Sequence, residues 1–187
     1  MKETTAKKKF MWNMAGSLCN SLSSMLLLII VNRISGESRG GFFALAYSTA
    51  QLLFSVGGFE IRPVQSTDIK NKFTFDQYFT SRMLNCIIML ICMIGYIVVN
   101  GYTGVEALTV FWILGYRMVE AVADVYSGLF QQRERIDISG KEMLMRSGIS
   151  TITFTIILWL TDNLLYAAMT LTLTSLVIML FYDLHMK

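Results

Sequence analysis

The sequence predicts an all-α membrane protein: a single bundle of about six transmembrane helices over residues 1–187, with both termini in the cytoplasm. Hydrophobic residues fill 54% of the 187 positions and the mean hydropathy is +0.52, whereas soluble domains are about 45–50% apolar. Only 16% of the residues are charged, and the charges form short clusters between long apolar runs. Because such segregation is what a bilayer imposes, a soluble enzyme is excluded.

Six apolar stretches are long enough to cross a bilayer, which takes about 20 residues in a helix. They are residues 10–32, 41–61, 78–100, 107–130, 144–161 and 164–182. The N-terminal tail and two of the linkers are rich in cations: Lys7, Lys8, Lys9, Arg62, Lys70, Lys72, Arg133, Arg135 and Lys141. Basic segments stay in the cytoplasm, so this distribution places both linkers and both termini there.

The first span carries polar residues at helical spacing: Asn13, Ser17, Asn20 and Ser24. Similar stripes run along the second, fifth and sixth spans: Ser48, Gln51, Ser55, Ser147, Thr151, Thr155, Thr170 and Thr174. Lipid tails cannot hydrogen-bond these groups, so each stripe faces another helix or a wet cavity. Both interpretations stay open for the hydroxyl stripes. Asn13 and Asn20 favour a cavity, because amides are costlier to bury than hydroxyls.

The fourth span contains the costliest residues, since Arg117, Glu120 and Asp124 lie on one helical face. A charge at the bilayer centre costs from about 2.5 kcal/mol upward, so these residues must pair or contact water. One interpretation is an ion-pair network that orients the helices. The other is an aqueous path in which Arg117 binds an anion and the carboxylates couple to protons or cations. Arg82 in the third span is either a second anion contact or a snorkelling residue.

Other classes of function leave no comparable pattern. The net charge is +3, but the basic residues lie at the ends of the spans, so we expect no nucleic-acid partner. Cys19, Cys86 and Cys92 lack metal-binding spacing, and the single histidine, His185, lies in the terminal tail. We therefore expect no metal, no cofactor and no enzymatic activity, with a proton or cation gradient as the available source of coupling.

Two segments resemble the polysaccharide and O-antigen flippases of the multidrug/oligosaccharidyl-lipid/polysaccharide exporter group. Residues 58–68 (GFEIRPVQSTD), followed by residues 75–78 (FDQY) and Arg82, are similar to the linker between the second and third helices of these flippases. Residues 120–132 (EAVADVYSGLFQQ), followed by residues 135–146, resemble the end of their fourth helix and the loop beyond it. The resemblance extends over essentially the whole chain.

This resemblance implies one N-terminal lobe of a transporter in which two six-helix bundles face a central cavity. Such a transporter moves an undecaprenyl-diphosphate-linked oligosaccharide across the bacterial cytoplasmic (inner) membrane by alternating access, during surface polysaccharide and lipopolysaccharide O-antigen biosynthesis. Carried over to this chain, the cavity-facing residues are Arg82, Arg117, Glu120 and Asp124, and the residues of the cytoplasmic linker are Arg62 and Asp68.

The expected partners are the lipid-linked oligosaccharide, membrane lipids, the polysaccharide polymerase machinery, and a second six-helix half or another copy of the chain. Flippases of this family have roughly twice as many helices, so the chain is expected to be a fragment, a split-gene product or a half-transporter. Two alternatives stay open. One is a drug/cation antiporter of the same superfamily, and the other is a polytopic membrane enzyme of lipid-linked sugar synthesis.

Overall fold

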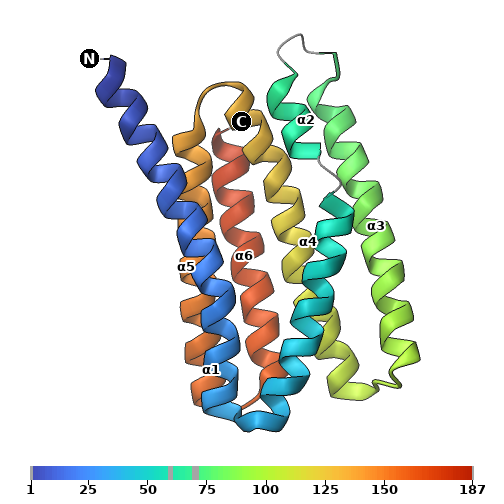
Figure 1. Ribbon diagram of the computed structural model, residues 1–187. Helices are drawn as coiled ribbons and strands as arrows, with labels where there is room; N and C mark the ends of the chain where they lie inside the picture. The colour runs from blue at the N-terminus through green and yellow to red at the C-terminus, as the bar shows by residue number, and fades with distance from the viewer. Residues whose placement is uncertain (1, 59–60, 69–71, 187) are drawn as a thin grey trace.

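The computed structural model describes residues 2–58, 61–68 and 72–186. This part of the chain contains helices and no strand: α1 (Lys2–Gly58), α2 (Ile61–Thr67), α3 (Phe75–Val99), α4 (Gly104–Gln132), α5 (Ile136–Thr161) and α6 (Leu164–Met186). The long helices run side by side as one bundle, and the short α2 lies at the end of the bundle where α1 begins (Figure 1). The all-α prediction is confirmed.

Helix α1 is a hairpin of two antiparallel arms that meet at Gly36, where φ is 84° and ψ is 172° (Figure 1). Glycine adopts this backbone region without a steric penalty, so the chain reverses within a very short turn. The arms correspond to the first two predicted spans, but helix fills nearly all of the predicted linker between them. The Tyr47 hydroxyl donates a hydrogen bond to Ser24 Oγ at 3.0 Å, which ties one arm to the other.

Among the described residues, four helices are long and apolar enough to cross a membrane. Their apolar stretches are Ala6–Ser55, which contains both arms of α1, Phe75–Val99, Ile136–Thr161 and Leu164–Tyr182. Helix α4 is as long as these but is interrupted by Arg117, Glu120 and Asp124, which lower its hydropathy. The structure therefore supports a membrane protein.

The bundle buries α4 at its centre and exposes apolar side chains around its outside. Helix α4 packs against α1, α2, α3, α5 and α6. The core between the helices includes Leu27, Phe43, Ile113, Phe154 and Leu171, all of which are fully buried. From Leu84 onward the outer face of α3 is largely apolar, with Leu84, Ile87, Ile88, Ile91, Ile94 and Val98 exposed. Large apolar surfaces of this kind are expected where helices contact lipid.

Two helix boundaries differ from the predicted spans for an identifiable reason. Helix α5 begins at Ile136 rather than at residue 144, and α2 forms inside the predicted linker between the second and third spans. The prediction counted apolar residues, whereas the first turns of α5 contain Lys141 and Glu142. Helix continues through them because Glu142 pairs with Arg146 one turn later.

Helices α1 and α5 approach so closely that their backbones touch at two glycines. A Cβ atom added to Gly140 would lie 2.4 Å from the Trp12 carbonyl oxygen, and one added to Gly16 would lie 2.2 Å from the Gly140 carbonyl oxygen. Backbone atoms cannot rotate away as a side chain can. Close helix contact at small residues is a recurring way to pack transmembrane helices.

We therefore expect Gly140→Ala to lower the free energy of unfolding by about 1–3 kcal/mol, because the added methyl group forces α1 and α5 apart. The measurement is thermal unfolding of the purified chain in detergent. Gly95→Ala in α3 is the matched control, since a Cβ atom there meets nothing within 4 Å. A melting temperature for Gly140→Ala equal to that of the control would contradict the close contact.

Candidate functional site

A polar cavity of about 220 Å³ lies between α1, α2, α4 and α5. Eight of its ten lining residues are polar or charged: Ser17, Asn20, Ser21, Arg62, Glu120, Asp124, Ser127 and Arg146, with Phe54 and Met143 completing the wall. Hydroxyl, amide and ionic groups thus surround a cavity in a protein whose outer surface is apolar. This makes the cavity the candidate functional site.

Helix α4 supplies the acidic wall of the cavity. Arg117 and Glu120 are three residues apart, and their side chains form an ion pair that is almost completely buried. Glu120 Oε1 also accepts a hydrogen bond of 2.7 Å from Asn20 Nδ2, which connects α4 to α1. The Arg117 guanidinium lies 4.4 Å from the centroid of the Tyr47 ring, so the second arm of α1 contacts the same charge.

Asp124 is held between two arginines from different helices. Its Oδ1 atom lies 3.1 Å from Arg62 Nη1 of α2, and its Oδ2 atom lies 2.8 Å from Arg82 Nη2 of α3. Arg82 is 1% exposed, whereas the side chains of Arg62 and Asp124 are 28% and 22% exposed. One carboxylate therefore joins α2, α3 and α4, and the Arg62 side of this junction opens into the cavity.

Sequence reasoning missed the second arginine of the cavity, Arg146, and its partner Glu142. Arg146 Nε lies 2.6 Å from Glu142 Oε1, and both side chains are buried. Arg146 Nη1 is buried and has no hydrogen-bond partner among the described residues. Opposite charges four residues apart signal such a pair on a helix, but Glu142 lay outside the predicted fifth span.

The buried network carries more positive than negative charge. Its basic members are Arg62, Arg82, Arg117 and Arg146, and its acidic members are Glu120, Asp124 and Glu142. Besides Arg146 Nη1, the Nε and Nη2 atoms of Arg117 are also buried without a hydrogen-bond partner in the described part of the chain. Of these two arginines, only Arg146 lines the cavity.

Three residues predicted to face the cavity are not among its lining residues, namely Asn13, Arg82 and Arg117, and Asp68 lies in the linker after α2. Asn13 does not line the cavity, and its backbone packs against Gly140 of α5. Asp68 organises the linker: it accepts backbone N–H groups of Lys72 at 3.0 Å and Phe73 at 3.1 Å, and the Tyr78 hydroxyl at 3.1 Å. The Lys72 and Phe73 backbone donors hold the pKa of Asp68 below its usual range.

Some hydroxyls of the predicted polar stripes line the cavity, and others are hydrogen-bonded within their own helix. Ser17 lines the cavity. In α5 and α6, the hydroxyls of Ser147, Thr155 and Thr170 donate to the backbone carbonyl four residues earlier in their own helix. Hydroxyls satisfied in this way can pack between helices without water.

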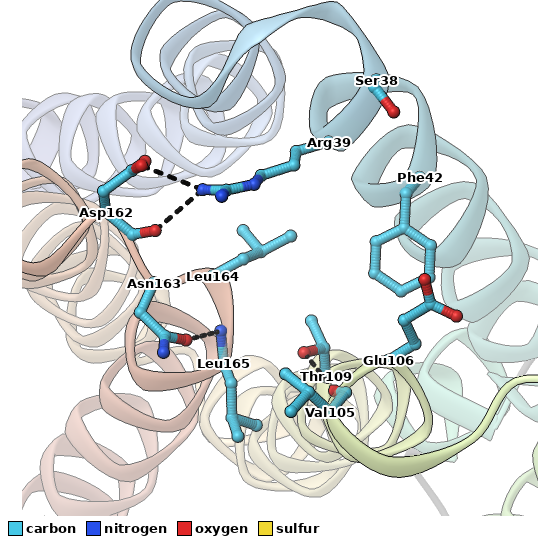
Figure 2. Close-up of a pocket in the computed structure, with 10 residues that line it drawn as sticks. All are labelled: Ser38, Arg39, Phe42, Val105, Glu106, Thr109, Asp162, Asn163, Leu164 and Leu165. Atoms are coloured by element: carbon cyan, nitrogen blue, oxygen red, sulfur yellow. Dashed lines mark hydrogen bonds and ion pairs between the residues drawn. The ribbon is translucent and has the colours of Figure 1, made fainter.

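A second pocket, of about 300 Å³, lies at the opposite end of the bundle (Figure 2). Arg39, beyond the turn of α1, reaches Asp162 between α5 and α6 with Nη1–Oδ2 and Nη1–O distances of 3.1 and 2.9 Å. Figure 2 shows Glu106 and Phe42 across the pocket from this pair. Both partners are more than half exposed, so the pair resembles ordinary surface ion pairs.

Comparisons with protein-family models, curated proteins and solved structures find no match to this chain. Within the described ranges, no group of three His, Cys, Asp or Glu residues is placed to hold a metal ion.

Replacing Glu120 by Gln should destabilise the protein by about 3–5 kcal/mol, because Arg117 and Arg146 then remain buried with less compensating charge. Asp162→Asn is the matched control, since it also neutralises the carboxylate of an ion pair but at an exposed site, where the cost is about 1 kcal/mol or less. Unfolding of both variants in detergent gives the comparison. Equal losses of stability would show that the buried network does not hold the bundle together.

Proposed function

We propose that this chain forms one lobe of a flippase that moves undecaprenyl-diphosphate-linked oligosaccharides to the outer leaflet of the bacterial cytoplasmic membrane, for surface polysaccharide biosynthesis. The observation that carries the proposal is the polar cavity lined by Arg62 and Arg146, enclosed in a helical bundle with an apolar exterior. The resemblance of residues 58–82 and 120–146 to polysaccharide flippases supports it independently.

The cavity suits a diphosphate better than a cation. Arg62 and Arg146 reach it from α2 and α5, two separate walls. The carboxylates in it are already paired, Glu120 with Arg117 and Asp124 with Arg62 and Arg82. Guanidinium groups form charge-assisted hydrogen bonds with phosphate oxygens, which lets a lipid diphosphate exchange its water for protein donors.

The proposal assigns six crossings: one to each arm of α1 and one each to α3, α4, α5 and α6. Helix α4 crosses because its charged residues face the network inside the bundle and not the lipid. The α4–α5 turn, the end of α6 and α2 lie at the end of the bundle where α1 begins (Figure 1). The basic residues of the tail and of these connections belong to this end, which we assign to the cytoplasm.

A facing bundle completes the cavity in this proposal. Ser17 and Ser21 on the first arm of α1, and Ser48 and Ser55 on the second, are exposed side chains in apolar helices. The hydroxyls of Ser21 and Ser55 donate to the carbonyl oxygens of Ser17 and Gln51 in their own arms. Lipid offers no hydrogen-bond partner to Ser17 and Ser48, whereas a second six-helix half or a second copy of the chain, with water between the bundles, does. The partly exposed Asp124 is then accessible to protons or cations that drive the cycle.

A drug/cation antiporter is the second candidate, favoured by one observation: Glu120 and Asp124 both line the cavity. A cationic substrate would have to compete with Arg117, Arg62 and Arg82 for these carboxylates. The excess of arginine in the network makes this the weaker proposal.

Binding of farnesyl diphosphate, a short prenyl diphosphate, to the purified chain in detergent tests the proposal. Arg62→Gln should weaken binding roughly tenfold or more, since one charge-assisted hydrogen bond is worth about 1.5–3 kcal/mol. Arg39→Gln is the matched control, because Arg39 also pairs with an aspartate at 3.1 Å but lies at the other end of the bundle.

Two results would count against the flippase. One is that the wild-type chain does not bind the diphosphate. The other is that Arg39→Gln weakens binding as much as Arg62→Gln. Binding of the cationic dye ethidium, abolished by Glu120→Gln, would favour the antiporter instead.

A further inference from the structure

Two basic segments that lie far apart in the sequence meet at one end of the bundle. The first arm of α1 begins with Lys7, Lys8 and Lys9, and the second segment is the α4–α5 connection with the start of α5. Lys9 Nζ donates a hydrogen bond of 2.8 Å to the Glu134 carbonyl oxygen. Together the two segments form a basic cluster, made of Lys7, Lys8, Lys9, Arg133, Arg135 and Lys141.

The second contact within this cluster involves an aromatic ring. Lys141 Nζ lies 5.3 Å from the centroid of the Trp12 ring, so a cation of α5 sits over an indole of α1. The backbone contact between Trp12 and Gly140 holds these two side chains in the same place. The fold therefore brings together two basic segments that are far apart in the sequence.

The basic cluster carries an excess of positive charge. Its six cations have three carboxylates beside them in sequence, Glu134, Asp137 and Glu142, and Glu142 already pairs with Arg146. Lys9 bonds to a carbonyl oxygen and Lys141 lies over a ring, so neither interaction removes charge. The ion pairs among the described residues use Arg39, Arg62, Arg82, Arg117 and Arg146, and leave Lys7, Lys8 and Arg135 available.

We propose that the basic cluster is a binding site for the headgroup of an anionic phospholipid. An apolar surface lies directly below the lysines, where Phe10, Met11 and Met14 are exposed. Acyl chains contact that surface while the lipid phosphate contacts the lysines and arginines. Indole rings prefer the headgroup level, which places Trp12 at the depth of the phosphate. Clusters of four to eight Lys and Arg residues at this depth attract anionic lipids.

This site is separate from the proposed transport cavity, which is lined by Arg62 and Arg146 and by no member of the basic cluster. A resident lipid here anchors the α1–α5 contact and is not transported. The lipid site and the transport cavity are therefore tested by different measurements.

Trp12 is an intrinsic reporter for the site. In a variant that keeps Trp12 alone (Trp112→Phe, Trp159→Phe), fluorescence is measured in phosphatidylcholine vesicles that contain equal fractions of brominated phosphatidylglycerol or brominated phosphatidylcholine. We expect at least twofold stronger quenching by the brominated anionic lipid. A variant that keeps Trp159 alone reports from the other end of the bundle, where Trp159 is exposed, and should be quenched equally by both.

Side-chain variants then locate the effect. The double variant Lys8→Gln with Arg135→Gln should lose the preference for the anionic lipid, and Lys72→Gln, an exposed cation of the α2–α3 linker, should keep it. Equal quenching of Trp12 by the two lipids would overturn the proposal. So would a preference that survives replacement of all six cations of the basic cluster by Gln, because the basic cluster would then not be its source.

Discussion

Buried charge must be paired, and this constraint determines how the helices of the bundle are arranged. Ionic groups removed from water lose several kcal/mol of solvation each, which only close partners recover. Helix α4 carries Arg117, Glu120 and Asp124, and the partners come from α1, α2 and α3, while the Glu142–Arg146 pair of α5 borders the same cavity. The network therefore fixes which face of each helix turns inward. The apolar faces left outside suit lipid.

Pairing inside the bundle is incomplete. The protein leaves nitrogen atoms of Arg117 and Arg146 buried without partners, although an unsatisfied buried donor costs about 1–3 kcal/mol. Stability alone gives no reason to keep an extra guanidinium in the core. The diphosphate substrate that we propose suits this excess of guanidinium groups, because Arg62 and Arg146 reach the cavity.

The sequence was sufficient to predict an all-α membrane protein, because hydropathy identifies apolar helices. It was also sufficient to predict the charged face of α4, because helical spacing places those residues on one side. It was not sufficient for contacts made across the chain. Asn13 and Asn20 lie on one stripe, yet only Asn20 reaches Glu120, because the glycine contact draws Asn13 against α5. Arg62 seemed a linker residue, but α2 turns it toward Asp124. Arg146 was not predicted as a site residue, because its partner Glu142 lies in the polar first turns of α5, outside the predicted span.

The same constraint bears on what covers the cavity. Arg62 and Asp124 are each about a quarter exposed, on the side of the bundle where they line the cavity with Ser17 and Ser21. Lipid tails against that side would leave charges and hydroxyls unsolvated, at a cost that the rest of the bundle avoids by pairing. In the flippase that we propose, water reaches this side of the bundle because a second protein surface excludes the lipid. In that proposal, the constraint that turns the charged face of α4 inward also explains why a second surface covers the cavity.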